Sequence, residues 1–214
     1  MIAIIDSGIA NLRSVQKAFE RVGHPAKVVE DPRLLREARG IVLPGVGAFA
    51  DGIAKLTTAG FVEPLRREIA QGKPVLGICL GLHFLFSESE EFGRHRGLDL
   101  LPGKVVRFPA HGPAAGGTAP VPLKVPLIGW VPIRIRKAAP LLQGIPDGSH
   151  FYFVHSYYVA PADAEVVAAT AAYGVPFTAV LWRGNLMATQ FHPEKSQALG
   201  LRLLKNFGDL ALRC

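Results

Sequence analysis

A cysteine with the surroundings of a catalytic nucleophile, Cys79, lies in the sequence GICLG at residues 77–81. The apolar run before it, residues 75–78, predicts a short buried strand, and the run after it, residues 80–86, predicts a helix. Glycines two positions before and two positions after the cysteine permit the sharp strand-to-helix turn called a nucleophile elbow. The helix start would also place a positive dipole end beside the sulfur, which favours the thiolate. Read alone, the pentapeptide also fits a buried structural cysteine.

A thiol nucleophile needs a base, and the best-placed histidine is His192, in the sequence QFHPE. It follows an apolar run, residues 186–190, that predicts a strand, and loops after strands present catalytic groups in α/β proteins. Pro193 fixes the backbone and leaves Glu194 able to point back at the imidazole. We therefore predict that Cys79 attacks, that His192 transfers protons, and that Glu194 holds the imidazole tautomer and offsets the imidazolium charge. Without Cys79, the same residues would fit a loop histidine and a solvated glutamate.

A third element is the sequence PGVG at residues 44–47, which follows a predicted strand at residues 41–43. The backbone N–H of Val46, together with the backbone N–H of Leu80, could form an oxyanion hole for a tetrahedral intermediate. By itself this sequence is a weak signal, because glycine-rich segments of this kind are usually simple turns.

The first half of the chain alternates strands with helices, which predicts an α/β fold with a mostly parallel central sheet and helices on both faces. The expected strands are residues 2–6, 26–29, 41–43 and 75–78, and the expected helices are residues 11–22, 61–71 and 80–86.

The second half contains short strand-like runs between turn signals, which predict antiparallel strand additions to the sheet. Residues 109–120 are rich in Pro, Gly and Ala and predict a mobile surface loop. No stretch resembles an interdomain linker, so residues 1–214 are expected to form a single domain. The expected strands are residues 104–108, 131–136, 151–154, 165–172, 178–182 and 186–190, followed by a helix at residues 196–212.

The composition narrows the possible partners and cofactors. Lys and Arg number 24 against 17 Asp and Glu, a formal charge of +7. Because the basic residues are scattered, we expect no nucleic acid and favour an acidic partner protein. The apolar runs are too short to cross a bilayer and no leader opens the chain, so we expect no membrane and a cytoplasmic location. The two cysteines, Cys79 and Cys214, form neither a disulfide framework nor a zinc site, and no metal or other cofactor is expected.

The ordered motifs PGVG, GICLG and FHPEKS resemble those of the class I, or triad, glutamine amidotransferases. Three other segments are similar to those of one subgroup, the glutaminase subunits of imidazole glycerol phosphate synthases: Ile5-Asp6 followed by Gly8 and Asn11-Leu12, GW at 129–130 and FVHSY at 153–157. The resemblance extends from residue 2 to about residue 207. It implies a flavodoxin-like sheet.

The resemblance also implies a reaction in two parts. Cys79 would attack the side-chain amide of L-glutamine, release ammonia and form a γ-glutamyl thioester, and water activated by His192 would then release glutamate. The ammonia would pass to a (β/α)₈-barrel cyclase subunit in a heterodimer. That partner would make imidazole glycerol phosphate and an aminoimidazole carboxamide ribotide, in histidine biosynthesis. The partner would bind the phosphates, so no phosphate loop is expected here.

The resemblance further assigns residues to the substrate and to the partner. Substrate binding falls to Gly45, Gly47, His83, Ser156 and Tyr157, and the partner interface with the ammonia exit to Asn11, Trp130, Tyr152 and Lys195. A pairing of Lys195 with an acidic barrel residue would help the two subunits associate. By default, Trp130 and Tyr152 fit core or strand positions and Lys195 fits an ordinary surface lysine.

The chain departs from the family pattern at a few positions. His83 stands where the family usually has Gln, Val131 where Asn is usual and Ser7 where an aromatic residue is common. His155 could be a second base, but a role in shaping the region behind the substrate is favoured because a base must reach the nucleophile. Two alternatives stay open: a glutaminase subunit of another synthase, such as one serving pyridoxal phosphate synthesis, and a catalytically silent binding subunit.

Overall fold

The computed structural model describes residues 1–6, 8, 11–112 and 120–213, and its central element is an eight-stranded sheet within that part of the chain. The sheet begins with parallel strands in the spatial order β2 (Ala26–Val29), β1 (Ile2–Ile5), β3 (Gly40–Gly45), β4 (Val75–Cys79) and β16 (Leu186–Thr189). It continues with antiparallel strands β15 (Val175–Arg183), β14 (Val167–Tyr173) and β11 (Arg134–Ile135). The predicted fold class is confirmed, and the parallel part has the strand order of a flavodoxin-like sheet.

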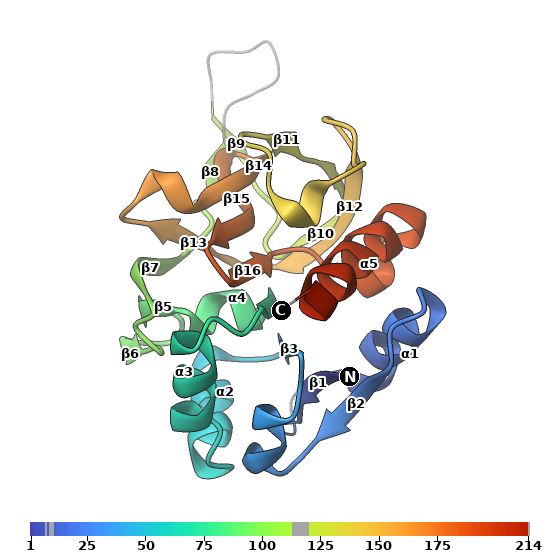
Figure 1. The fold of residues 1–214 in the computed structure, drawn as a ribbon. Coiled ribbons are helices and arrows are strands. Elements are labelled where there is room, and N and C mark those ends of the chain that lie inside the picture. Colours follow the sequence, from blue (N-terminus) through green and yellow to red (C-terminus); the bar gives the residue numbers. More distant parts are fainter. Residues whose placement is uncertain (7, 9–10, 113–119, 214) are drawn as a thin grey trace.

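Helices cover both faces of the sheet (Figure 1). Helices α1 (Leu12–Arg21) and α5 (Gln197–Arg213) pack on one face, where the rings of Phe19 and Phe207 lie 6.1 Å apart. Helices α2 (Phe49–Thr58) and α3 (Val62–Ala70) cover the other face with the short α4 (Leu80–Phe84). No helix in the described residues is both long enough and apolar enough to span a membrane.

The remaining strands form smaller sheets beside the carboxyl edge of the parallel strands. One contains β13 (Tyr157–Pro161), β7 (Leu101–Arg107), β5 (Phe86–Ser89) and β6 (His95–Arg96). Another pairs β10 (Leu127–Pro132) with β12 (His150–His155), and a third pairs β8 (His111–Gly112) with β9 (Val121–Pro122). Single 3₁₀ turns occur at η1 (Pro32–Arg36), η2 (Pro140–Leu142), η3 (Ala164–Val166) and η4 (Pro193–Lys195).

Several local predictions were wrong because distant pairing overrides the local pattern. The helix expected at residues 80–86 ends at Phe84, since the next residues form β5 and pair with β7. The strand expected at residues 131–136 is divided between β10 and β11, which belong to different sheets. The strand expected at residues 165–172 begins as η3, because the side chain of Asp163 accepts a hydrogen bond from the N–H of Glu165.

Two further segments concern the sequence predictions: one helix was not predicted, and most of one predicted loop lies outside the described residues. Helix α2 was not predicted. A loop was expected at residues 109–120. Within it, residues 111–112 pair with β9, and residues 113–119 lie outside the described part of the chain. Cys214 also lies outside it.

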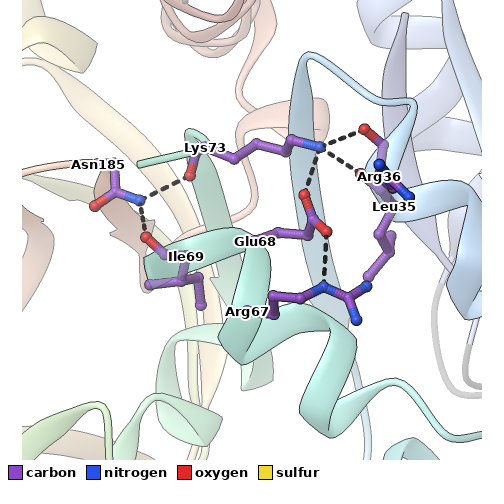
Figure 2. A network of polar contacts seen from close by, with 7 residues as sticks. All are labelled: Leu35, Arg36, Arg67, Glu68, Ile69, Lys73 and Asn185. Carbon is purple, nitrogen blue, oxygen red and sulfur yellow. Dashed lines mark hydrogen bonds and ion pairs between the residues drawn. The ribbon is translucent and has the colours of Figure 1, made fainter. Parts of the chain in front are cut away.

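A buried ion pair holds together the amino ends of the parallel strands (Figure 2). The Glu68 side chain on α3 is 1 % exposed, and its Oε2 lies 2.8 Å from Lys73 Nζ. Lys73 Nζ also donates to the carbonyl oxygens of Leu35 and Arg36, at 2.6 and 2.9 Å. Asn185 Nδ2 donates to the carbonyl oxygen of Lys73 at 2.8 Å. The segments entering β3, β4 and β16 are thereby joined.

The charge of Glu68 depends on this network. Burial alone would raise the pKa of its carboxyl group, but the hydrogen bonds and charges of Lys73 and Arg67 outweigh burial and lower the pKa. A depressed pKa means that the pair stabilises the fold at neutral pH and loses that contribution as the pH falls through the folded-state pKa.

We predict that Lys73→Met lowers the free energy of unfolding by about 3 kcal/mol, because it leaves the buried Glu68 carboxylate without its main counter-charge. The matched control is Lys17→Met, which removes an ion pair with Glu20 at 2.7 Å whose lysine side chain is 59 % exposed. Exposed pairs contribute about 1 kcal/mol or less. Urea unfolding of the two variants gives the comparison, and equal losses would show that the buried network is not a stabilising element.

Candidate active site

The strand–turn–helix expected around Cys79 is present. Cys79 ends β4 with φ 54° and ψ −108°, a backbone conformation that costs a non-glycine residue about 1–3 kcal/mol. The flanking glycines make the turn possible. A Cβ atom on Gly77 would lie 2.9 Å from the carbonyl oxygen of Gly81, and one on Gly81 would overlap the carbonyl oxygen of Leu43. Larger residues at either position would therefore force the elbow apart.

His192 reaches Cys79 because their strands are parallel neighbours. Strand β16 pairs with β4 so that Thr189 lies opposite Ile78, and both strands end at the same edge of the sheet. The backbone of His192 is held in place by its N–H, which donates to the carbonyl oxygen of Tyr152 at 3.0 Å, and by its carbonyl, which accepts from Ser196 Oγ at 2.7 Å. The motifs GICLG and QFHPE, which are far apart in the sequence, therefore meet at the carboxyl ends of adjacent strands.

Glu194 is positioned as a partner of the imidazole. Its Oε1 lies 2.8 Å from His192 Nδ1, and both side chains are almost fully buried. Burial alone would lower the pKa of His192, but hydrogen bonds and charges from Cys79 and Glu194 raise it to about 10. Nδ1 of His192 donates to Glu194, so the ring nitrogen that contacts Cys79 is Nε2. At neutral pH the site therefore holds an imidazolium between a sulfur and a carboxylate.

A cavity of about 360 Å³ opens over the sulfur. It brings together two of the expected catalytic residues, Cys79 and His192, with most of those expected at the substrate and the oxyanion hole: Val46, Gly47, Leu80, His83, Ser156 and Tyr157. Gly45 is placed differently. It is buried in β3 opposite Cys79, where a Cβ atom would lie 2.9 Å from Leu80 Cβ, so its small size lets β3 pack against α4.

Two polar residues near the sulfur had no role in the sequence predictions. Glu91 lines the cavity, its carboxylate accepts the N–H of Phe49 at 2.7 Å, and burial raises its pKa. Gln190 is fully buried, with its Nε2 4.0 Å from Cys79 Sγ and its Oε1 2.9 Å from His83 Nε2. Glu91 lies in an acidic run without periodicity, and Gln190 follows an ordinary strand, so neither position carried a local signal.

His155 also lines the cavity, with its ring 5.3 Å from that of Phe177. Its Nδ1 lies 2.8 Å from the carbonyl oxygen of Tyr157, and burial lowers its pKa to about 3 despite that hydrogen bond. The ring is neutral and packed among aromatic side chains. This geometry favours a role in shaping the cavity wall rather than a role as a base.

Three of the residues expected at a partner interface lie together, and one of them, Lys195, also lines the cavity. Trp130 on β10 is opposite Tyr152 on β12, with ring centroids 6.1 Å apart, and Lys195 Nζ lies 5.9 Å from the centre of the Tyr152 ring. Trp130 is 45 % exposed, and Ile128, two positions earlier on the same strand, is 60 % exposed. Asn11 precedes α1 and lines a small cavity beside Glu194. The exposed Ile128 extends this surface and was not predicted.

The arrangement suits acyl transfer: a sulfur nucleophile, a buried imidazolium to protonate a leaving group, and a carboxylate to orient it. Across residues 1–6, 8, 11–112 and 120–213, no group of three or more His, Cys, Asp or Glu side chains is placed to hold a metal ion.

The family follows from the match of this chain to a sequence model. The model described as glutamine amidotransferase class-I matches residues 3–210, and the chain belongs to this family. Within it, the chain is 59 % identical over 210 residues to imidazole glycerol phosphate synthase subunit HisH of Syntrophotalea carbinolica, covering 98 % of this chain and 100 % of the relative. It is 54 % identical over 209 residues to the protein of the same name from Geobacter sulfurreducens, covering 98 % of each.

Solved structures agree on the fold. A crystal structure of a glutamine amidotransferase superposes with a TM-score of 0.73 at 20 % identity, covering 99 % of each chain. A chain in the structure of PurLQS from Thermotoga maritima superposes with a TM-score of 0.71 at 16 % identity, covering 99 % of this chain and 97 % of that one.

We predict that Glu194→Gln moves the alkaline limb of the kcat profile for glutamine hydrolysis to lower pH by at least about one unit, because a carboxylate next to an imidazolium raises its pKa by about that much or more. The raised pKa keeps His192 charged as the pH rises. Without the Glu194 carboxylate this pKa is lower, so His192 loses its proton at a lower pH. The profile is measured with saturating glutamine.

The control for this profile is Glu63→Gln, on a side chain that is 85 % exposed. Glutamine itself titrates equally in all three enzymes, so a difference between profiles reports the protein. Coincident alkaline limbs for the original chain and Glu194→Gln would contradict the assigned pairing.

Proposed function

We propose that this chain is the glutaminase subunit of an imidazole glycerol phosphate synthase, which hydrolyses L-glutamine to glutamate and passes the ammonia to a cyclase subunit for histidine biosynthesis. The observation that carries the proposal is the buried line from Cys79 and His192, which line the cavity, to Glu194 behind His192. The names of the relatives at 59 % and 54 % identity favour this synthase over other glutamine-dependent ones. Residues 1–214 would act as one domain in the cytoplasm.

Acylation begins with attack of the Cys79 sulfur on the side-chain amide carbon of glutamine. The carbonyl oxygen becomes an oxyanion, for which the backbone N–H groups of Val46 and Leu80 are the proposed donors; both residues line the cavity beside the sulfur. Leu80 is the first residue of α4, so its N–H has no partner within the helix. His192 then gives its proton to the amide nitrogen, the C–N bond breaks, and ammonia leaves with a γ-glutamyl thioester on Cys79.

Deacylation uses the same groups in the reverse sense. Having lost its proton, His192 takes one from a water molecule, and the resulting hydroxide attacks the thioester carbon. The C–S bond breaks, glutamate leaves, and Cys79 and His192 return to their paired state. Glu194 remains hydrogen-bonded to His192 Nδ1 throughout, which holds the imidazole tautomer and stabilises its charged form. Gly47, His83, Ser156 and Tyr157 are proposed to bind glutamine, and Gly45 is proposed to shape the site by letting β3 pack against α4.

The partner is proposed to be a (β/α)₈-barrel cyclase that forms a heterodimer with this chain. A surface next to the cavity supports this partner, because Trp130, Tyr152 and Lys195 form one contiguous group and Ile128 adds exposed apolar area. Lys195 lines the cavity as well, so a partner bound over this surface would also cover the active site. Ammonia released into a covered cavity reaches the partner without passing through bulk solvent.

We predict that Cys79→Ala abolishes glutamine-dependent synthesis by the complex and leaves ammonia-dependent synthesis unchanged, because the cyclase needs only ammonia. Loss of a nucleophile typically lowers the rate by about 10⁴-fold or more. The control is Cys214→Ser, which removes the other cysteine. Glutaminase activity retained by Cys79→Ala would contradict its role, and an original chain without glutaminase activity would instead identify a silent binding subunit.

The two tryptophans of the chain provide a matched test of the interface. We predict that Trp130→Ala weakens binding of the cyclase by about 2 kcal/mol or more, as truncation of a central aromatic residue does at many interfaces. The control is Trp182→Ala. Trp182 lies on another part of the molecule, where its indole N–H donates to the carbonyl oxygen of Gly184. Titration calorimetry measures both variants. Equal affinities for Trp130→Ala and the original chain would place the partner elsewhere.

A further inference from the structure

A chain of buried polar groups leads from α4 to the nucleophile. His83 Nε2 lies 2.9 Å from Gln190 Oε1, and Gln190 Nε2 lies 4.0 Å from Cys79 Sγ. Gln190 is 0 % exposed and His83 is 4 % exposed. The two residues come from different elements, since His83 is in α4 and Gln190 directly follows β16. Neither is part of the Cys79–His192–Glu194 line.

The chemistry of the two side chains fixes their orientation. An amide presents either its oxygen or its NH₂ group to the sulfur, and the oxygen would repel a thiolate. With NH₂ toward the sulfur, the amide oxygen faces His83 and needs a donor there. His83 must therefore carry its proton on Nε2. The opposite tautomer would turn the amide around and place its oxygen against the sulfur.

We infer that His83 is a positioning residue that acts through Gln190: its Nε2–H holds the Gln190 amide so that the NH₂ group donates to the sulfur of Cys79. The inference rests on the proposed function, in which that sulfur attacks glutamine. It gives His83, which stands where the family usually has Gln, a task that does not require direct contact with substrate.

The surroundings keep this arrangement fixed. Burial lowers the pKa of His83 to about 4, although the hydrogen bond with Gln190 opposes this, so the ring stays neutral and adds no second charge beside the imidazolium of His192. The backbone N–H of Gln190 donates to the carbonyl oxygen of Ala179 at 2.9 Å. The next residue, Phe191, stacks on Phe151 with ring centroids 4.1 Å apart. Gln190 therefore has a rigid backbone from which its amide reaches the sulfur.

The test measures the reactivity of Cys79 directly. All variants carry Cys214→Ser, so that iodoacetamide modifies only Cys79, and the second-order rate of alkylation is measured at pH 7 on the full chain. The variants are Gln190→Met, His83→Phe, the double variant and the conservative His83→Gln. Steady-state kcat and KM for glutamine are measured for the complex with the cyclase. Alkylation needs no glutamine, so failure of the proposed glutaminase function would be seen separately.

We expect Gln190→Met and His83→Phe each to lower the alkylation rate by about 10-fold, the effect of one hydrogen bond to a charged group. The value of kcat should fall in parallel, and in Gln190→Met KM should change little, because His83 lines the cavity and Gln190 is not among its lining residues. The double variant should lose no more than either single variant, because His83 acts only through Gln190. In His83→Gln the side-chain NH₂ can donate to Gln190 Oε1, and the alkylation rate should recover.

Several results would overturn the inference: an unchanged alkylation rate in His83→Phe, losses that multiply in the double variant, or a change confined to KM, which would indicate that His83 acts on glutamine binding alone and not on the sulfur. Gln190→Glu provides an independent test if His83→Phe does not fold. It keeps the shape of the side chain, and in its ionised form it can present only acceptor oxygens to the sulfur. It should therefore alkylate more slowly than Gln190→Met, and an equal or faster rate would refute the donor role of the amide.

Discussion

The parallel pairing of β4 with β16 is the constraint on which the site depends. Cys79 and His192 are separated by more than a hundred residues in the sequence, and only the adjacency of these strands brings their carboxyl ends together. The register also decides which side chains meet. Thr189 pairs with Ile78, so the residues just beyond, Gln190 and His192, are the ones that reach the sulfur. A shift by one residue would reverse the faces of the strand and remove both contacts.

The catalytic residues lie at the carboxyl edge of the sheet, and the buried ion pair that stabilises the fold lies at its amino edge. At the carboxyl edge, Cys79 has a strained backbone and the cavity leaves polar groups open to a substrate. At the amino edge, Lys73 joins Glu68 to the carbonyl groups that precede β3. The strain at an active site persists only where surrounding structure holds it in place. The buried ion pair of Glu68 and Lys73 contributes to this support. It fixes where β3 and β4 begin, and therefore where their carboxyl ends lie.

The parts predicted from the sequence were those set by local chemistry. The glycines of GICLG led to the elbow, and the structure shows why they are needed: a larger residue at position 81 would overlap Leu43, and one at position 77 would crowd Gly81. The alternation of apolar runs led to the parallel sheet. Features set by distant contacts were missed. Helix α2 contains Gly52 and ends in Thr57 and Thr58, which are weak helix formers, so its stability comes from burying one face. Gln190 was missed because its importance depends on a neighbouring strand.

The departure at His83 illustrates how one site can change without losing its geometry. A glutamine at this position would offer an amide to its neighbours, whereas a neutral histidine offers one donor and one acceptor on a rigid ring. The donor is used on Gln190, which leaves the other ring nitrogen as an acceptor in a side chain that lines the cavity. The same residue can thus hold an amide against the nucleophile and present a lone pair to the substrate cavity. Because the Cys79–His192–Glu194 line does not pass through position 83, the substitution alters the support of the sulfur while the proton-transferring groups keep their contacts.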